Sequence, residues 1–233
     1  MESDTPPRSS QDAAAVLLVN PQMCRPSGTR LPLSVLNLGA VLEGRRPWRI
    51  LDGNRGPITG AALAALAEQP HALVGVTVMP GPQVAPAIEI SAAIRAAFPS
   101  VPIAWGGYFP TLYPDSAVNA PYVDYLVRGQ GEATLLELLD RLPDAGPPTA
   151  TDSARDPSAI RGVAGLTWKQ DGRPVHNPER PLVNPDALPP LPYERLGDVH
   201  GYLCFSFMGC RTAIHQTTLN YRFKYKFYNI ISI

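Results

Sequence analysis

The sequence predicts an α/β fold built on a doubly wound, five-stranded parallel sheet. Between residues 14 and 142, five short apolar runs alternate with segments in which apolar residues recur at helical spacing. The runs are continuous rather than alternating, which is typical of strands buried on both faces of a sheet. Strands that alternate with helices form parallel sheets covered on both faces.

The expected strands and helices follow one another in a regular order. The strands are AAVLLVN (14–20), WRILD (48–52), ALVGVTV (72–78), VPIAW (101–105) and VDYLV (123–127). The helices between and after them are expected at 31–44, 59–69, 84–98, about 110–118, and 132–142. In the third helix, Ile90, Ile94 and Phe98 are spaced at i, i+4 and i+8, so they share the face that packs on the sheet.

Segments of different character flank this expected domain of residues 14–145. The polar residues 1–13 read as a disordered leader. Residues 146–200 read as a Pro-rich linker that contains a small β-hairpin at 163–177, since Asp171-Gly172 supplies a two-residue turn. The prolines after the hairpin favour an extended path over a surface.

The composition changes again after Cys210. All 19 Gly and all 27 Pro lie before that point, and RTAIHQTTLNYRFKYKFYNIISI follows it. We interpret this tail as foreign to the rest of the protein, through a frameshift, a disrupted gene or a gene-prediction error. A genuine variable C-terminus is the alternative.

Charge and composition exclude several classes of function. The 20 basic and 20 acidic side chains balance, which argues against general affinity for nucleic acid or anionic membranes. No apolar run approaches the roughly 20 residues that span a bilayer, and the first residues do not form a signal peptide. Three cysteines make no disulfide framework. We therefore expect a cytoplasmic protein without a membrane span and without a nucleic-acid partner.

The loops after the third and fourth strands hold the first candidate ligand-binding residues, because open parallel sheets bind ligands beyond the carboxyl ends of their strands. Thr77 ends the third strand, and Gly81 lies in the loop that follows. Gly106 and Gly107 follow the fourth strand, where the absence of a Cβ would let a large flat ligand approach the backbone. A tight strand-to-helix turn is the alternative for this pair.

The loop before the last helix contains Gly129, Gly131 and Glu132. The Glu132 charge suits the helix dipole, and that structural role is a sufficient explanation by itself. The sequence lacks a GxxxxGK[ST] phosphate loop, a GxGxxG dinucleotide fingerprint after the first strand and a GxSxG nucleophile elbow.

Eight stretches, taken in order, resemble the N-terminal cobalamin-binding half of cobalamin-dependent radical S-adenosylmethionine enzymes. They are VLLVNP (16–21), LPLSVLNLGAVLE (31–43), ILDGN (50–54), LVGVTVMPGPQ (73–83), IAWGGYFPTLYP (103–114), VDYLVRGQGEATLLELL (123–139), VAGLTWKQDGRPVHN (163–177) and DALPPLPYERL (186–196). The resemblance covers about residues 14–210 and implies a flavodoxin-like sheet that holds cobalamin edge-on at the strand ends.

The resemblance also implies which residues contact the cofactor. By this match we expect the cobalamin site to include Thr77, Val78, Gly106, Gly107, Tyr108 and Thr111. The strand-end loops add Gly81, Gly129, Gly131 and Glu132 to the expected site. The family loop usually reads Gly-Glu-Gly-Glu, so Gln130 is a departure. The first-strand loop has no histidine to ligate cobalt, and His71 precedes the third strand at the wrong end of the sheet.

In this family, DALPPLP leads into a barrel that opens with Cys-x-x-x-Cys-x-x-Cys. Three such thiolates hold a [4Fe–4S] cluster and leave one iron for S-adenosylmethionine. Cys210 matches the first cysteine, but Ile214 and Thr217 stand at the other two positions. We therefore expect Cys210 to be a remnant metal ligand, the chain to be truncated, and the cluster and S-adenosylmethionine to belong only to an intact family member.

Four functions stay open on this reading. The first is a cobalamin-binding fragment that is not catalytic alone, and the second is a methyltransferase-like enzyme whose barrel a partner supplies. The third is a stand-alone cobalamin carrier or sensor, and the fourth is a different nucleotide-binding α/β domain. No protein partner is identified. We expect Gly107→Val to abolish cobalamin binding without disturbing the fold, and the domain to fold without residues 197–233.

Overall fold

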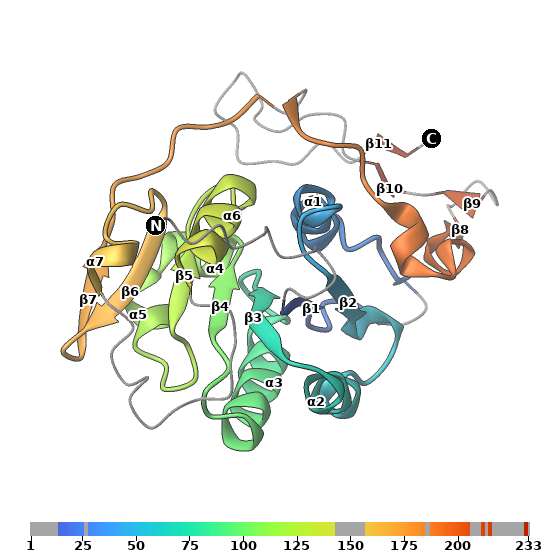
Figure 1. Ribbon diagram of the computed structural model, residues 1–233. Coiled ribbons are helices and arrows are strands. Elements are labelled where there is room, and N and C mark those ends of the chain that lie inside the picture. Colours follow the sequence, from blue (N-terminus) through green and yellow to red (C-terminus); the bar gives the residue numbers. More distant parts are fainter. Residues whose placement is uncertain are drawn as a thin grey trace, which may run out of the picture.

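A seven-stranded sheet between two layers of helices forms the body of the protein (Figure 1). The computed structural model describes residues 14–25, 28–142, 157–184, 187–205, 211–212, 214–215 and 231–232. The strand order is β2-β1-β3-β4-β5-β6-β7. The strands are β1 (Ala15–Asn20), β2 (Trp48–Asp52), β3 (His71–Thr77), β4 (Ile103–Gly106), β5 (Tyr125–Val127), β6 (Leu166–Gln170) and β7 (Arg173–His176).

The first five strands confirm the predicted parallel sheet. Each of them pairs in parallel with its neighbours in the order 2-1-3-4-5, which is the flavodoxin-like order. Every residue of β1 and β3 is buried, as the continuous apolar runs predicted. At the carboxyl ends of the strands, Asn20 pairs with Asp52, and Thr77 pairs with Gly106.

The helices divide between the two faces of the sheet (Figure 1). The core on one face includes residues of α1 (Leu33–Leu42), α6 (Glu132–Arg141) and α7 (Pro157–Ile160). The core on the other includes residues of α2 (Thr59–Glu68), α3 (Val84–Ala97) and α5 (Pro114–Val118). The single helix expected near 110–118 is two helices, α4 (Tyr108–Leu112) and α5. Pro114 explains the break, because it disfavours a helical conformation at the residue before it.

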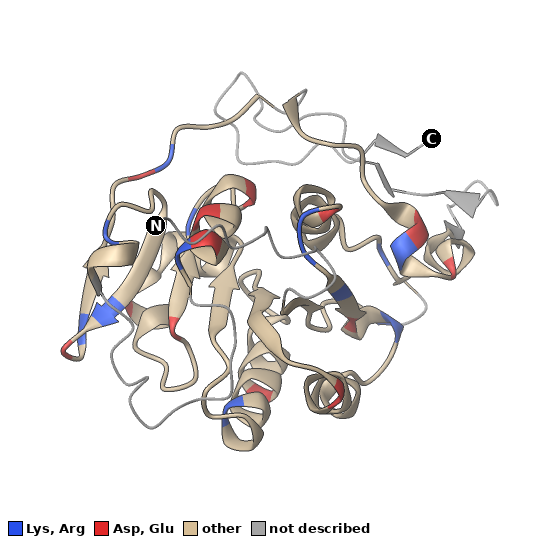
Figure 2. Cartoon of the chain, in the orientation of Figure 1, with Lys and Arg blue, Asp and Glu red and all other residues tan. Residues whose placement is uncertain are grey.

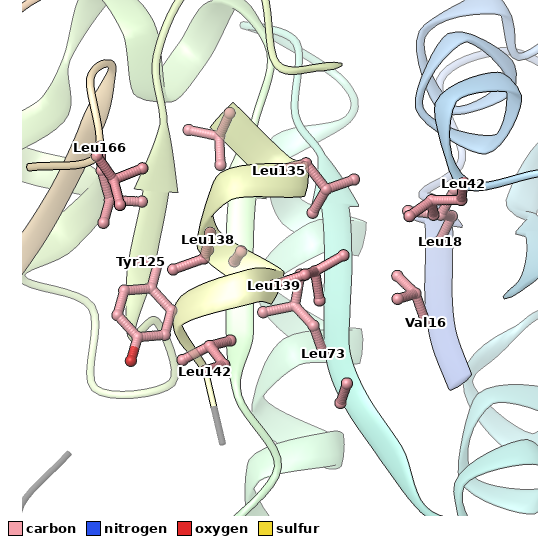
Figure 3. Close-up of a cluster of buried hydrophobic side chains, with 14 of the residues drawn as sticks. Val16, Leu18, Leu42, Leu73, Tyr125, Leu135, Leu138, Leu139, Leu142 and Leu166 are labelled. Carbon is pink, nitrogen blue, oxygen red and sulfur yellow. The ribbon is translucent and has the colours of Figure 1, made fainter. Parts of the chain in front are cut away.

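Successive side chains along a strand point to opposite faces of the sheet, so each strand contributes to both hydrophobic clusters. Val16 and Leu18 of β1 lie in the cluster beneath α1 and α6, whereas Leu17 lies in the cluster beneath α2 and α3. Figure 3 shows the first cluster, in which Leu138 and Leu139 of α6 reach toward the sheet. Burial of an apolar side chain of this size stabilises a fold by roughly 1.5–3 kcal/mol, so the two clusters account for much of the stability of the sheet.

The predicted hairpin forms and extends the sheet. Asp171 and Gly172 both have positive φ, 51° and 74°, as a two-residue type I′ turn requires. β6 pairs antiparallel with β5, with Tyr125 opposite Trp168. The hairpin is therefore not a separate appendage of a linker, but the continuation of the main sheet.

Residues 177–184 and 187–202, here called the strap, lead from the hairpin across α6 to the opposite edge of the sheet (Figure 1). Arg180 forms an ion pair with Glu137 and donates a 2.8 Å hydrogen bond to Thr134, both on α6. Farther along, the Arg195 guanidinium binds both carboxylate oxygens of Glu43 at 2.7 Å. The predicted extended path over a surface is confirmed, because residues 177–184 form no helix or strand.

The end of the strap contacts the loop that follows β2, which bears on the expectation that the domain folds without residues 197–233. The strap includes two short 3₁₀ helices, η4 (Tyr193–Leu196) and η5 (Val199–Tyr202). Tyr202 is buried, and the Arg55 guanidinium lies 5.2 Å from its ring centre. Arg55 also forms a salt bridge of 2.8 Å with Asp198. A chain ending at Leu196 would lose these contacts with the loop that follows β2.

Within the described residues, no helix is both long and apolar enough to cross a bilayer. Acidic and basic side chains are interspersed along the chain (Figure 2), in agreement with its balanced charge. Two short antiparallel pairs, β8 (Cys204–Phe205) with β9 (Arg211–Thr212) and β10 (Ile214–His215) with β11 (Ile231–Ser232), follow the strap. The expected leader, most of the expected linker before the hairpin, and Cys210 lie outside the described residues.

Candidate ligand site at the carboxyl ends of the strands

A pocket lies where the strand order of the parallel sheet reverses. The helix after β1 covers one face of the sheet and the helix after β3 covers the other, so β1 and β3 flank the switch point at which such sheets bind ligands. The pocket has a volume of about 70 Å³, which exceeds what a water molecule needs but is far below that of a pocket enclosing a drug-sized ligand. It is lined by Asn20, Met23, Arg30, Leu31, Pro32, Leu33, Ser34, Asn54, Thr77, Met79 and Gln83.

A buried glutamine ties together the loops around this pocket. The Gln83 Nε2 donates hydrogen bonds to Asn20 Oδ1 (2.9 Å) and to the Pro21 carbonyl (2.8 Å), and its Oε1 accepts the Met79 N–H (2.8 Å). Asn20 in turn donates a 2.7 Å bond to Asp52 Oδ1. The ends of β1 and β2 and the loop after β3 are thus one hydrogen-bonded unit.

Asn54 approaches the same pocket from the short 3₁₀ helix η2 (Gly53–Arg55) after β2. Only 1% of the residue is exposed. Its Oδ1 accepts the N–H groups of Met23 (2.8 Å) and Cys24 (3.1 Å), which fixes the orientation of the side-chain amide.

Sequence reasoning missed Asn20, Ser34, Asn54 and Gln83 as site residues. A signal existed for Asn20, because it is a polar residue that closes an otherwise apolar strand. Gln83 stands directly before α3, where the sequence alone reads it as an ordinary helix start. The roles of these side chains depend on loops that are distant in sequence.

The predicted residues of the third and fourth strands do come together. Thr77 is buried, lines the pocket, and its Oγ1 lies 3.2 Å from Ser34 Oγ. The Val78 N–H donates to the Gly106 carbonyl at 2.8 Å, which extends the ladder between β3 and β4 by one bond. The carboxyl ends of these strands therefore form one rigid edge.

The two glycines after β4 have different roles. Gly107 has a φ of 97°, and an added Cβ would lie 2.9 Å from the Val78 carbonyl oxygen. A side chain at Gly107 would therefore disturb the backbone itself, so the expectation that Gly107→Val spares the fold is wrong. At Gly106 the nearest atom to an added Cβ is the Val127 oxygen at 3.7 Å, which is an ordinary contact.

Thr111 and Tyr108 also behave differently. The Thr111 hydroxyl donates to the Gly107 carbonyl (2.7 Å) and accepts the Gly129 N–H (3.0 Å), so it joins the loop after β4 to the loop after β5. Tyr108 is 43% exposed, next to the exposed Leu112. Tyr108 therefore offers an aromatic surface at the edge, whereas Thr111 holds the edge together.

The loop before α6 packs against α1. An added Cβ at Gly131 would lie 3.3 Å from Leu38 of α1, and Gly129 has a φ of 70°. Burial raises the pKa of the Glu132 carboxyl in the first turn of α6. Gly81 is exposed, has a φ of 98° and has no atom within 4 Å of an added Cβ, so the structure gives it a turn-forming role.

Gln130, which stands where the family loop usually has a glutamate, hydrogen-bonds to the strap. Its Oε1 accepts the Val183 N–H at 2.6 Å, and its Nε2 donates to the Val183 carbonyl at 3.3 Å. A glutamate could accept the first bond but could not donate the second. Gln130 therefore serves the strap rather than the pocket.

The described residues hold no cluster of three or more His, Cys, Asp or Glu side chains that could bind a metal ion. His71 is the first residue of β3 and is buried, so it lies at the end of the strand opposite the pocket. Cys210, the expected remnant ligand, is outside the described residues.

The arrangement suits one edge of a large flat molecule with polar appendages. Gly106 leaves the backbone open to approach, Tyr108 and Leu112 offer exposed apolar surface, and the small pocket at the switch point is lined by hydrogen-bonding groups. Corrinoids have this shape and chemistry, so the residues present fit a cobalamin.

Comparison with known proteins points to the same ligand. The B12-binding domain family matches residues 29–139. An uncharacterized methyltransferase of Pyrococcus horikoshii is 26% identical over 168 residues, which are 71% of this chain and 34% of that protein. The anaerobic magnesium-protoporphyrin IX monomethyl ester cyclase of Synechocystis is 25% identical over 180 residues, or 72% of this chain and 33% of that protein. The chain thus spans about a third of the length of these relatives.

Solved structures share the fold. The cobalamin-dependent S-adenosylmethionine radical enzyme OxsB with aqua-cobalamin bound superimposes with a TM-score of 0.65 at 21% identity, over 82% of this chain and 26% of OxsB. The radical S-adenosylmethionine methyltransferase TsrM from Kitasatospora setae, with cobalamin and a [4Fe–4S] cluster bound, gives 0.57 at 26% identity, over 77% of this chain and 31% of TsrM. The chain therefore contains a B12-binding domain and is structurally similar to the N-terminal parts of cobalamin-dependent radical S-adenosylmethionine enzymes.

Proposed function

We propose that this chain binds cobalamin along the carboxyl ends of β1, β3, β4 and β5. The observation that carries the proposal is the match of the B12-binding family to residues 29–139, a span that contains all ten expected contact residues and most of the pocket. The open backbone at Gly106 and the exposed ring of Tyr108 support it, because a flat macrocycle needs such a surface.

The residues of this edge would hold the cofactor in separate ways. Gly106 would let the macrocycle approach the backbone, and Thr77 and Ser34 would offer hydroxyl groups beside the pocket. Gln83 would act indirectly, by fixing the loops that surround the ligand. A bound cobalamin would supply a cobalt centre that can carry a methyl group.

Equilibrium titration with hydroxocobalamin tests this proposal. The purified chain should retain about one equivalent of corrinoid after desalting, with an absorbance spectrum distinct from that of the free cofactor. Gly106→Val should weaken binding at least about tenfold, since a bulky side chain would occupy the approach, while the urea-unfolding midpoint stays near that of the unsubstituted protein. Retention of no corrinoid would overturn cobalamin binding. Unchanged affinity of Gly106→Val would overturn the assignment to this edge.

We further propose that the chain acts as the cofactor domain of a radical S-adenosylmethionine enzyme and is not catalytic alone. The two curated relatives are an uncharacterized methyltransferase and a cyclase, and the chain matches about a third of each. Within the sequence, Cys210 lacks the two further cysteines that the cluster motif needs. A [4Fe–4S] cluster and S-adenosylmethionine would then be bound by residues other than those described.

Two measurements separate this role from an autonomous enzyme and from a stand-alone carrier. After anaerobic reconstitution and reduction, the chain alone should form no 5′-deoxyadenosine above the free-iron background. Turnover would show an enzyme complete in itself. A CxxxCxxC motif in another reading frame downstream of codon 210 would establish an enzyme fragment, and its absence from all three frames would favour the carrier.

A further inference from the structure

The short helix η2 contacts the pocket through one residue and the end of the strap through the next. Asn54, its middle residue, lines the pocket and accepts the N–H groups of Met23 and Cys24. Arg55, its last residue, donates a 2.9 Å hydrogen bond to the Gly201 carbonyl in η5. Because the two residues are adjacent in one tight turn, a shift of Arg55 is passed directly to Asn54.

Arg55 holds η5 through three contacts. Besides Gly201, its guanidinium forms a 2.8 Å salt bridge with Asp198 and lies 5.2 Å from the centre of the Tyr202 ring. Asp198 also caps η5, since its Oδ1 accepts the Gly201 N–H at 3.1 Å. An exposed ion pair alone contributes little, but the three contacts together determine where η5 docks on η2.

Asp52 lies between the pocket and Tyr202. Its Oδ1 accepts hydrogen bonds from Asn20 Nδ2 (2.7 Å) and from the Asn54 N–H (3.0 Å), and both asparagines line the pocket. Its Oδ2 is buried and makes no hydrogen bond of ordinary geometry among the described residues. Burial and the nearby Asp52 charge raise the pKa of the Tyr202 phenol, so the hydroxyl lies beside this carboxylate. Tyr202 is buried but belongs to neither core cluster, so its burial depends on the docking of η5.

We propose that docking of η5 on η2 holds the pocket in the arrangement that binds cobalamin. The inference rests on the function proposed above and adds how the segment after the domain regulates affinity. Asp52, Arg55 and Tyr202 are then positioning residues. They act through the pocket residues Asn20 and Asn54. Coupling between two sites is reciprocal, so bound cobalamin stabilises docked η5 by the same factor.

Asp198→Ala is the sharpest test, because Asp198 is exposed and does not line the pocket. The substitution removes the salt bridge with Arg55 and the cap on Gly201, so η5 should dock less often. Hydroxocobalamin affinity should fall about three- to tenfold, while the urea-unfolding midpoint stays near that of the unsubstituted protein. Asp198→Asn keeps an acceptor for the Gly201 N–H and should lose less.

Two further variants test the route of the effect. Tyr202→Phe keeps the ring beside Arg55 but removes the hydroxyl beside Asp52, and it should weaken hydroxocobalamin binding about two- to fivefold. If Asp198 acts through Arg55, the double variant Arg55→Gln/Asp198→Ala should bind no more weakly than Arg55→Gln alone. Losses that add would show that Asp198 acts by another route.

Arg195→Gln is the matched control on the strap. Arg195 binds Glu43 at the end of α1 that lies away from the pocket, so its loss should change cobalamin affinity less than about twofold. Amide hydrogen exchange tests the reciprocal effect. Saturating hydroxocobalamin should slow exchange at Gly201, in η5, about three- to tenfold. Exchange at the Arg195 amide, which donates to the Pro192 carbonyl in η4, should change less.

The outcomes separate this coupling from cobalamin binding itself. Retention of no corrinoid by the unsubstituted chain would overturn the proposed function. Normal binding that is unchanged in Asp198→Ala would overturn only the coupling, and so would equal losses in Asp198→Ala and Arg195→Gln. If Tyr202→Phe lowers the urea midpoint, Asp198→Ala still decides, because its side chain is exposed.

Discussion

The two ends of the parallel strands use polar side chains in different ways. At the amino end, Asp124 accepts the N–H of Ile103 at 2.8 Å and forms an ion pair with Arg95, so its charge is matched within the protein. At the carboxyl end, the buried amides of Gln83 and Asn54 tie together the loops that surround the pocket. The polar side chains at the amino end pair with one another, whereas those at the carboxyl end surround a pocket.

The largest effect should come from Gly107→Val. Its φ of 97° and the 2.9 Å approach to the Val78 carbonyl leave no room for a branched side chain, so we expect a loss of about 3 kcal/mol or more in the free energy of unfolding. Urea unfolding followed by circular dichroism measures it. Gly106→Val is the matched control and should cost less than about 1 kcal/mol. Equal losses at the two positions would contradict the distinction between them.

Gln83→Leu should come next, with a loss of about 2–3 kcal/mol, since it leaves the Asn20 oxygen, the Pro21 carbonyl and the Met79 N–H without their partner. Cobalamin affinity should fall as well. Arg95→Gln breaks the ion pair at the amino end and should cost about 1 kcal/mol without changing that affinity. The comparison of the two ends fails if Arg95→Gln weakens cobalamin binding as much as Gln83→Leu does.

Acidification should lower the free energy of unfolding through His71, at the amino end of β3. Burial lowers the pKa of His71 below its ordinary value of 6.5, because the charged imidazole would lose its hydration. The folded state therefore prefers neutral His71, and the unfolded chain binds more protons at mildly acidic pH. The His71 contribution to stability is complete above pH 6.5 and declines as the pH falls through that value toward the folded-state pKa. Urea midpoints between pH 7.5 and 5.5 should fall less in His71→Gln than in the unsubstituted protein.

The smallest effect concerns the strap. Gln130→Glu keeps the acceptor for the Val183 N–H but loses the donor to the Val183 carbonyl and places a charge beside it. We expect a local cost of about 1 kcal/mol, seen as faster amide hydrogen exchange at Val183. Exchange at Leu73, in the core strand β3, should not change. Unaltered protection at Val183 would show that the side-chain amide does not hold the strap.

Continuous apolar runs predicted the parallel strands, because VLLV and LVGV can be satisfied only by burial on both faces. The hairpin turn was also predictable, since Asp171-Gly172 suits two positive φ angles. The attachment of the hairpin to β5 was not, because backbone pairing between segments about 40 residues apart leaves no local pattern.

The candidate site was predictable only in part. Glycines and strand-end residues such as Thr77 and Gly106 are visible because their positions follow from the fold. Asn54 and Gln83 are single amides in loops, and their roles arise from contacts with residues 30 to 63 positions away. The close approach at Gly107 was equally hidden, because it depends on the path of Val78, which directly follows the neighbouring strand β3.

The extension of the sheet by the hairpin has a consequence for self-association. An exposed strand edge is a template on which other chains can pair and aggregate. β5 would present such an edge, but β6 covers it, and the new outer strand β7 is four residues long and contains Pro174, which has no N–H to donate. At the other edge, Arg195 of η4 lies over the Trp48 ring of β2, 5.4 Å from its centre. Removal of the hairpin would therefore uncover the edge of β5, so we expect the five-stranded domain without the hairpin to aggregate more readily than the longer chain.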